Sequence, residues 1–450
     1  EPRHLFSVAS PPSAAGLMQR SAGPMARRVA CSVLSAVLLV APVRSDLSVV
    51  GLGDWGGHND EEPSTYSQRL TAIGLIRVAV EKQADFAMLM GDNFYLHGLT
   101  EGDMTSRFRD TFEAIYAQLL PGVPFYAFAG NHDYGEGQLA NVSLQLAYSK
   151  QVDTQWRFPS LWYKIHRDFE ADGKQRSLDM VVLDTIVLCG NGETNEDYIE
   201  QELRFLDGIG MQGPGSSGLS RRQAAAEVQW AWLERELMES KADYLWVAGH
   251  YPIWSAGNDG SQPCLIERLR PLLQAHGAHY ISGHDHMLEH FEDGDVNTFV
   301  VGAGKECCYP PVNLGSTKKG AIRYMLAGNL GSLSMPPVPF PVQGGFASMI
   351  FGAESVAVEL HAHDGTVLYA APRIARRVQS SDGMWFGKAV ATGSDDTMLA
   401  SLLTPRVAAA AAVVAVAASA ASVTSAIFVL RRMSRCDWQV RASAPLLLEQ

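Results

Sequence analysis

The sequence predicts an α/β protein, a four-layer αββα sandwich in which two mixed sheets lie face to face between outer helices. Three observations support this fold class. Short apolar runs alternate with segments of helical spacing, metal-ligand side chains follow five of those runs, and 47% of the 450 residues are apolar, which suffices for a large buried core. Strands that alternate with helices are typical of sheets with parallel neighbours.

The first half of the chain contains three predicted strands joined by two predicted helices. Each apolar run leads into a glycine and then a polar residue, first Asp54, then Asp92, then Asn131. Their spacings of 38 and 39 residues match one strand-helix-strand unit each, so we expect parallel strands with these side chains beyond the carboxyl ends, where such sheets bind ligands. The expected strands are 47–52, 86–90 and 124–128, and the expected helices are 69–80 and 107–120.

The second half repeats this arrangement. His250 follows an apolar run that a long helical segment precedes, and His284 and His286 follow a later run. Alternate residues of an extended turn face the same way, so both of these last imidazoles can point into one site. The expected strands are 180–183, 244–248, 280–282, 298–301, 355–360 and 367–370, and the expected helices are 222–240 and 266–275.

Seven residues at these strand ends have metal-ligand chemistry. A carboxylate such as that of Asp92 can bridge two cations, whereas amide and imidazole groups bind a divalent ion without adding charge. Two ions ~3.5–4 Å apart can hold the attacking and leaving oxygens of a displacement at phosphorus. The sequence therefore predicts a two-metal site that hydrolyses phosphoesters. The predicted ligands are Asp54, Asp92, Tyr95, Asn131, His250, His284 and His286.

Five motifs around these ligands resemble the motif set of the purple acid phosphatases, within the calcineurin-like metallophosphoesterase superfamily. The resemblance is greatest to the small, tartrate-resistant animal type and spans about residues 47–373. Tyr95 separates this group from general metallophosphoesterases, as does Gly56, where those relatives carry a metal-binding histidine. The motifs are Gly-Asp54-Trp-Gly, Gly-Asp92-Asn-Phe-Tyr95, Gly-Asn131-His132-Asp133, Ala-Gly-His250-Tyr-Pro-Ile-Trp and Gly-His284-Asp-His286.

The resemblance implies a dinuclear centre of Fe(III) and a divalent ion, which the sequence leaves open as Fe, Zn or Mn. Hydroxide on this centre would attack a phosphate monoester. A trivalent ion acidifies water more strongly than a divalent one, so an acidic pH optimum is expected, and a phenolate on Fe(III) would colour the protein purple. The implied ligands are Asp54, Tyr95 and His286 for Fe(III), Asn131, His250 and His284 for the divalent ion, and Asp92 as the bridge.

Two further residues are candidates for proton transfer. His132 is expected to orient the substrate or to protonate the leaving alkoxide, and the alternative is a supporting hydrogen bond. Nine residues after His250, where the animal enzymes carry another active-site histidine, this chain has Asp259. Its carboxyl group could donate a proton at low pH, but once ionised it would repel an anionic substrate.

The cysteines and one sequon agree with export. Cys189, Cys264, Cys307 and Cys308 allow three pairings, and none forms a CxxC metal site. The resemblance implies a disulfide between the first two and gives the last two no assignment. Asn141 begins an Asn-Val-Ser glycosylation acceptor, which needs an exposed loop in a secretory compartment.

Both ends of the chain are interpreted as targeting segments. Residues 25–45 have the basic start, apolar stretch and small residues of a signal peptide. Residues 407–430 form an uncharged run of 24 residues, which is long enough for a membrane span and is followed by arginines. The alternative for this run is an Ala-rich soluble helix or linker. The expected organisation is an unassigned extension (1–24), a signal peptide (25–45), a catalytic domain (46–380), a linker (381–406), a transmembrane helix (407–430) and a cytoplasmic tail (431–450).

Three function classes are compatible with the sequence. The first is an acid phosphatase that acts on small phosphomonoesters or phosphoproteins; the second is a related hydrolase of diesters or nucleotides with a non-ferric metal pair. The third is a membrane-displayed binding protein with a decayed site, which the intact ligand set disfavours. The formal charge of −12 disfavours nucleic-acid binding.

We expect a monomer of the secretory pathway, attached to a membrane, with its catalytic domain outside the cell or in an acidic lumen. The glycine-rich and arginine-ending loop 190–223 suggests a hypothesis: proteolysis there releases a restraint on the site. An ordinary tolerated insertion is the alternative.

Overall fold

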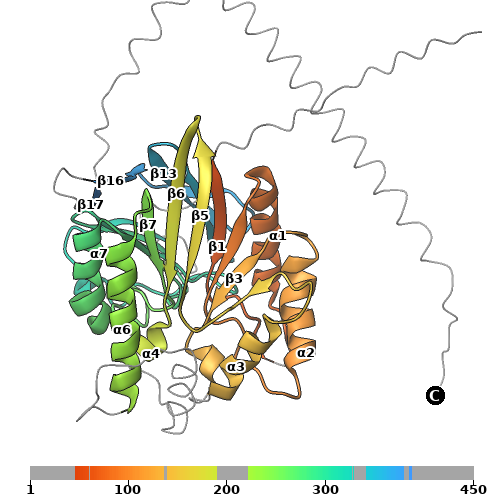
Figure 1. Ribbon diagram of the computed structural model, residues 1–450. Helices are drawn as coiled ribbons and strands as arrows, with labels where there is room; N and C mark the ends of the chain where they lie inside the picture. Colours follow the sequence, from red (N-terminus) through yellow and green to blue (C-terminus); the bar gives the residue numbers. More distant parts are fainter. Residues whose placement is uncertain are drawn as a thin grey trace, which may run out of the picture. The chain divides into compact units, whose positions relative to one another are not determined.

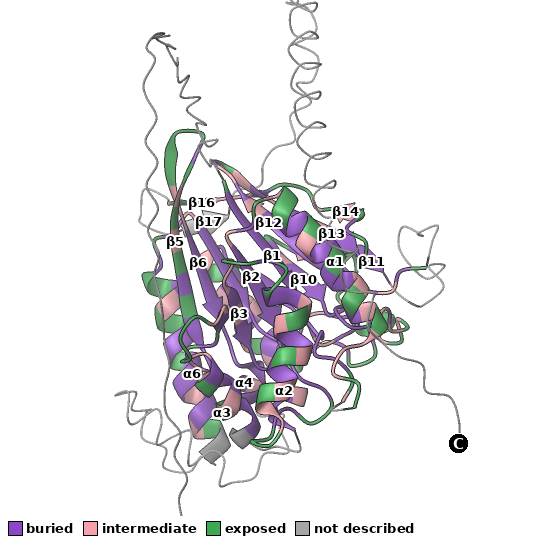
Figure 2. Ribbon diagram, turned by 90° about the vertical axis from the view of Figure 1, so that its right-hand side faces the viewer, coloured by how far each residue is buried: buried purple, intermediate pink, exposed green. Residues whose placement is uncertain are grey.

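Two mixed β-sheets pack against each other, and helices cover their outer faces (Figures 1 and 2). The computed structural model describes residues 46–59, 61–135, 139–189, 221–326, 328, 341–379 and 385–387. The predicted αββα fold is confirmed.

The first sheet has a parallel centre and antiparallel flanks. Its strand order is β14-β13-β12-β1-β2-β3-β4, with β15 paired to β13. The strands β1, β2, β3 and β4 run parallel, and β12 joins β1 antiparallel. The bounds are β1 Leu47–Leu52, β2 Phe86–Met90, β3 Phe125–Phe128, β4 Trp156–Arg157, β12 Gly345–Phe351, β13 Ser355–Ala362, β14 Val367–Ala370 and β15 Ile374–Ala375.

The second sheet has the order β11-β9-β10-β8-β7-β6-β5. Its strands β6, β7, β8 and β10 run parallel, whereas the hairpin β5-β6 and the pairs of β9 are antiparallel. A small third sheet pairs β16 Arg377–Gln379 with β17 Trp385–Gly387. The bounds in the second sheet are β5 Tyr163–Ala171, β6 Lys174–Val182, β7 Tyr244–Ala248, β8 His279–Ser282, β9 Leu288–Asp293, β10 Val296–Val301 and β11 Ile322–Leu326.

The central strands are continuous apolar runs because both of their faces are covered. Every residue of β1, β2 and β7 is buried. Across the interface between the sheets, the ring of Phe351 on β12 packs edge-on against Trp246 of β7 at a centroid distance of 6.2 Å. The backbones of the two sheets approach closely at Gly53, where a Cβ atom would lie 2.9 Å from the Cα of Gly283.

The helices lie on both outer sides of the sheets, with α1 and α2 on one side in Figure 1 and α6 and α7 on the other. Helix α1 begins three residues before the predicted start because Thr65 caps it. The Thr65 hydroxyl accepts from Gln68 N at 3.0 Å, and Gln68 Oε1 accepts from Thr65 N at 3.3 Å. The bounds are α1 Tyr66–Glu81, α2 Met104–Arg107, η1 Phe108–Ala117, η2 His132–Tyr134, α3 Leu139–Tyr148, α4 Thr185–Cys189, α6 Arg221–Glu239, η3 Leu265–Leu269, α7 Arg270–His276 and η4 Leu314–Ser316.

The structure differs from the sequence prediction in several elements. The helix expected over 107–120 is the short α2 followed by the π-helix η1, and the helix expected over 266–275 is the π-helix η3 followed by α7. The strands β5, β9, β11 and β12 were not predicted. They pair with strands that are distant or antiparallel neighbours, which apolar spacing does not reveal.

Several predicted segments lie outside the described residues. These are the upstream extension, the signal peptide, the transmembrane span 407–430 with its tail, and the loop 191–220 with its hypothesised cleavage. Within the described part of the chain, no helix is both long and apolar enough to span a bilayer. Those targeting and processing predictions stay predictions.

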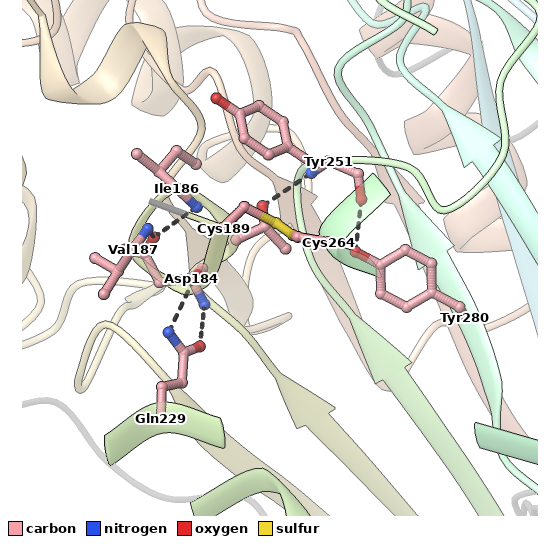
Figure 3. The surroundings of a disulfide bond; sticks show 9 residues. Asp184, Ile186, Val187, Cys189, Gln229, Tyr251, Cys264 and Tyr280 are labelled. Carbon is pink, nitrogen blue, oxygen red and sulfur yellow. Dashed lines mark hydrogen bonds between the residues drawn. A yellow bond between two sulfur atoms is a disulfide. The ribbon is translucent and has the colours of Figure 1, made fainter. Parts of the chain in front are cut away.

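A disulfide joins Cys189, the last residue of α4, to Cys264, just before η3 (Figure 3). This is the pairing that the resemblance implied. Asp184 Oδ1 accepts from the backbone nitrogens of Ile186 and Val187 at 3.1 and 2.9 Å, so the carboxylate caps α4. The disulfide therefore fixes the start of the loop that leaves the second sheet.

Replacing both cysteines in C189S/C264S should lower the free energy of unfolding by about 2–5 kcal/mol, because the bond closes a loop of 75 residues. Urea unfolding with chelator present measures this effect. The double variant C307S/C308S is the matched control: the structure joins these adjacent cysteines to each other, a bond that encloses no chain. Equal losses in the two variants would contradict the prediction.

Candidate metal centre

The first sheet brings four of the predicted ligands to one edge. Asp54, Asp92 and Asn131 follow the carboxyl ends of β1, β2 and β3, which are parallel neighbours. Tyr95 lies in the loop after Asp92, and its hydroxyl lies 2.8 Å from Asp92 Oδ2 and 3.2 Å from Asp54 Oδ1. The parallel register thus places these oxygens together.

The second sheet brings three histidines to the same place. His250 follows β7, and His284 and His286 follow its parallel neighbour β8. Across the two sheets, His286 Nε2 lies 3.5 Å from Asp54 Oδ1, and His250 Nε2 lies 3.4 Å from Asp92 Oδ1. The ring of His284 lies 5.1 Å from that of His250. All seven predicted ligands therefore converge.

The backbone at these strand ends is tightly constrained. Asp54, Asp92 and His284 have φ angles of 56°, 51° and 75°, in the left-handed region. Such conformations cost about 1–3 kcal/mol each and persist where the surrounding structure enforces them, typically at functional sites. At Gly130 a Cβ atom would lie 2.2 Å from Asp92 Oδ1, so only glycine fits there.

One group of lone pairs surrounds His250. Its Nδ1 lies 2.9 Å from the carbonyl oxygen of Met90, so Nδ1 carries the proton and donates. Its Nε2 faces Asn131 Oδ1 at 3.1 Å and Asp92 Oδ1 at 3.4 Å. An imidazole nitrogen and two oxygens, all atoms that can bind a metal ion, thus lie together.

A second group of lone pairs surrounds His286. Its Nδ1 lies 2.7 Å from Glu306 Oε1 and donates to it, which orients the ring. Its Nε2 lies 3.1 Å from Tyr95 Oη and 3.5 Å from Asp54 Oδ1. The sequence did not reveal Glu306, because its segment matched no motif.

The two groups share the carboxylate of Asp92. Its Oδ1 faces His250, and its Oδ2 faces Tyr95. Asp54, Asp92 and His250 are all buried, and one ligand atom from each lies within 4.8 Å of the others. Carboxylate and imidazole groups that converge in a buried place match the ligand chemistry of a divalent or trivalent metal ion. The residues therefore fit a metal pair bridged by Asp92.

The charges in the site depend on its buried carboxylates and histidines. Burial disfavours ionisation of Asp92, but the neighbouring His250 and His132 outweigh it and lower the pKa of this carboxyl. Burial, Asp54 and Asp92 raise the pKa of Tyr95 far above its ordinary value. Burial also lowers the pKa of His284, which keeps the imidazole neutral. A bound cation reverses the balance for Tyr95, because it favours the phenolate.

His132 lies at the rim of this group of ligands. Its Nδ1 lies 2.8 Å from the carbonyl oxygen of Leu96 and donates to it. Its Nε2 lies 4.0 Å from Asp92 Oδ2, and the side chain is 32% exposed. The ring packs against Tyr95 at a centroid distance of 4.5 Å. The backbone of Leu96 therefore fixes one nitrogen of His132, and the other nitrogen lies beside Asp92.

Asp259 lies in the loop between β7 and η3, with its side chain exposed. Asp285 holds this loop, because its two carboxylate oxygens accept from Asp259 N and Gly260 N, each at 3.0 Å. Partial burial raises the pKa of Asp259, and the fields of His286 and His250 oppose that rise.

Asp133 supports the ligand loops, a role that the sequence did not reveal. Its buried carboxylate accepts from Gly130 N at 2.8 Å, Gln145 Nε2 at 2.8 Å, Asn93 N at 3.0 Å and Phe94 N at 3.1 Å. It thereby joins the loop after β2 to the loop after β3. The only sequence signal is its position in the Gly-Asn-His-Asp motif.

Comparison with known proteins agrees with this geometry. The family model described as calcineurin-like phosphoesterase matches residues 47–288, more than half of the chain. The chain belongs to the calcineurin-like phosphoesterase family. The tartrate-resistant acid phosphatase type 5 of Rattus norvegicus is 37% identical to it over 263 residues, which cover 58% of this chain and 73% of the rat protein.

Other relatives of this phosphoesterase carry related names. The tartrate-resistant acid phosphatase type 5 of Homo sapiens is 36% identical, with 60% of this chain and 78% of the human protein covered. Purple acid phosphatase 17 of Arabidopsis thaliana is 28% identical, with 61% and 73% covered. The predicted family is confirmed, as is the prediction that the chain is an enzyme, a phosphoesterase.

One solved structure shares the fold of this phosphoesterase. It is GAP50, the anchor in the inner membrane complex of Plasmodium, with a TM-score of 0.55 and 20% identity over 73% of this chain and 89% of that chain. At this identity the likeness shows the fold alone.

The glycosylation sequon of this phosphoesterase does not lie in the exposed loop that was expected. Asn141 lies in α3, is only 9% exposed, and its Nδ2 donates to the carbonyl oxygen of His97 at 2.8 Å. A glycan on this nitrogen would displace that hydrogen bond. Asn141 is therefore buried in a helix, whereas a glycosylation acceptor was expected to be exposed.

Proposed function

We propose that this phosphoesterase is an acid phosphatase that hydrolyses phosphate monoesters at a dinuclear centre of Fe(III) and a divalent ion. The observation that carries the proposal is the carboxylate of Asp92, with one oxygen in each group of lone pairs and Tyr95 in only one of them. A phenol is a ligand suited to Fe(III), so its presence in one group supports two unlike ions. The divalent ion is Fe, Zn or Mn.

Each ion has its own ligands in this proposal. When bound, such an ion pair supplies Lewis acidity and a nucleophile for displacement at phosphorus. The ligands are Asp54, Tyr95 and His286 for Fe(III), Asn131, His250 and His284 for the divalent ion, and Asp92 for both.

His132 is proposed to protonate the leaving alkoxide and to orient the phosphate. The hydrogen bond from His132 Nδ1 to the carbonyl oxygen of Leu96 supports this role, because it fixes the ring and leaves Nε2 for the substrate.

The setting of the enzyme is part of the proposal. We infer a secretory-pathway monomer, held to a membrane by residues 407–430, that acts on small phosphomonoesters or phosphoproteins outside the cell or in an acidic lumen. The disulfide between Cys189 and Cys264 supports an oxidising compartment, where such bonds persist. The net charge of −12 supports the absence of nucleic-acid partners.

The colour of the purified protein tests the Fe(III) assignment. We expect visible absorption from the iron-loaded protein and its loss in Tyr95→Phe, because the phenolate oxygen that gives the band is removed. Absorption spectra and metal analysis measure both. Tyr251→Phe is the matched control, since its ring also packs beside a proposed ligand, at 4.5 Å from His284. A colourless but active wild-type protein would favour the non-ferric hydrolase of diesters or nucleotides.

Asp259 gives a test of pH dependence. Because burial raises its pKa, the carboxyl group is neutral in acid and becomes charged as the pH rises through that raised value. The charge then repels the phosphate, so Asp259→Asn should lower KM for p-nitrophenyl phosphate roughly fivefold near pH 7, from about 1 kcal/mol of repulsion. The two enzymes should converge near pH 4.

Steady-state kinetics across pH measure this difference. The matched control is Asp168→Asn, because this carboxylate is 74% exposed on β5. An equal KM in Asp259→Asn and wild type at every pH would contradict an electrostatic effect of Asp259 on the substrate.

A further inference from the structure

Lys305 and Glu306 lie beside the proposed metal centre and belong to none of the ligand motifs. They follow a glycine-rich turn after β10, and this turn contacts the loop of Asp54. At Gly304 a Cβ atom would lie 2.4 Å from the carbonyl oxygen of Gly53, so a side chain there would force the two loops apart. Lys305 N donates to the carbonyl oxygen of Asp54 at 2.8 Å. The backbone thus fixes where both side chains begin.

The side chain of Lys305 lies on the ring of Tyr95. Its Nζ is 3.8 Å from the ring centroid, and the residue is only 7% exposed. A cation over an aromatic face is attracted by the electron density of the ring, and burial strengthens the attraction. The face of this proposed ligand is therefore covered by a positive charge.

Glu306 contacts His286, which is proposed to bind the same Fe(III) ion as Tyr95. Its Oε1 lies 2.7 Å from His286 Nδ1 and 3.6 Å from Lys305 Nζ. A carboxylate that accepts from the outer nitrogen of a ligating histidine fixes the ring and makes the inner nitrogen a stronger donor. One carboxylate oxygen thus connects His286 to the cation on Tyr95.

The residues that follow hold this pair in position. Tyr309 stacks on the ring of His286, with centroids 4.4 Å apart and an interplanar angle of 17°. Tyr309 N donates to the carbonyl oxygen of His286 at 3.1 Å. Glu306 and Tyr309 therefore contact His286 from the two ends of one short segment.

We propose that Lys305 and Glu306 are positioning residues that set, in opposite directions, how strongly Tyr95 and His286 donate electrons to a bound trivalent ion. The Lys305 charge stabilises negative charge on the Tyr95 phenolate and weakens its donation. Glu306 strengthens donation by His286. This inference rests on the proposed function, because it assigns both ligands to the trivalent ion.

Binding of Ga(III), which is trivalent, colourless and not reduced, tests the inference without iron chemistry. The full-length apo-protein is titrated with chelator-buffered Ga(III). Lys305→Met should bind Ga(III) about tenfold more tightly, because a positive charge near the ion is removed. Glu306→Gln should bind it about 10–100-fold more weakly. A purely structural role would weaken binding in both variants.

Two further variants separate charge from packing. Lys305→Arg keeps the cation and should retain the wild-type affinity. Lys82→Met is the matched control, because Lys82, directly after α1, is also partly buried and paired with a carboxylate, that of Glu359 on β13 at 2.7 Å. It should leave Ga(III) binding unchanged.

The visible spectrum and the reduction potential of the iron-loaded protein give an independent test. Lys305→Met should shift the visible band to longer wavelength and lower the reduction potential, whereas Glu306→Gln should raise the potential. Ga(III) affinities that fall in both variants, or change in neither, would overturn the inference. A colourless iron-loaded wild type would overturn the ferric phenolate of the proposed function instead, and the opposite Ga(III) effects would still be measurable.

Discussion

Asp92→Asn should lower kcat for p-nitrophenyl phosphate by on the order of a thousandfold or more, which corresponds to about 4 kcal/mol of transition-state stabilisation. The amide keeps the shape of the side chain but loses a charge and one of the two acceptor oxygens. Those oxygens face His250 on one side and Tyr95 on the other. Either proposed ion would then lose a ligand, and Asn131→Ala should have a similar effect on the divalent ion alone.

Kinetics and metal analysis of the purified variants measure this loss, with circular dichroism to show that folding is retained. Asp172→Asn is a suitable control, because Asp172 also has a left-handed backbone, with φ of 49°, but lies at the exposed tip of the β5-β6 hairpin. Full turnover and full metal content in Asp92→Asn would contradict a site built on this carboxylate.

Asp133→Ala should lower the free energy of unfolding by about 3–5 kcal/mol. The change leaves the buried donors Gly130 N, Asn93 N, Phe94 N and Gln145 Nε2 without the acceptor that they share. Each unsatisfied buried donor costs about 1–3 kcal/mol, and partial collapse of the site recovers some of the sum.

Urea unfolding in the presence of chelator separates this effect from any loss of metal. Asp103→Ala is the matched control: this aspartate accepts from Thr100 N at 2.8 Å, but the bond is exposed to solvent. Its removal should cost about 1 kcal/mol or less. Equal destabilisation by both variants would show that Asp133 does not hold the two ligand loops.

The sequence predicted the parts of the fold that depend on local pattern. The strands β1, β2, β7 and β14 have the predicted bounds, because each is a short apolar or alternating run with clear turn residues at its ends. The strand β12 was missed although it pairs with β1 in the middle of the first sheet. Its place depends on pairing with residues about 300 positions earlier, and local composition carries no record of that.

The candidate site likewise contains residues that local sequence pattern predicts and residues that it does not. The ligands were predictable because a rule connects them to the sequence: polar residues that follow parallel strands meet at one edge. The supporting residues Asp133, Lys305 and Glu306 follow no such rule. Lys305 reaches Tyr95 only because β10 ends beside β1, and the π-helical turns of η1 and η3 likewise arise from packing rather than from apolar spacing.

The division of the ligands between the sheets has a consequence for stability. Asp54, Asp92, Tyr95 and Asn131 belong to one sheet, and the three histidines belong to the other, so any ion held by both sets acts as a removable cross-link between the sheets. Ions that bind only the folded state stabilise it in proportion to the logarithm of their concentration. Resistance to heat in this protein would then depend on the concentration of the metal ions that it binds, so chelation would act on the fold as well as on turnover.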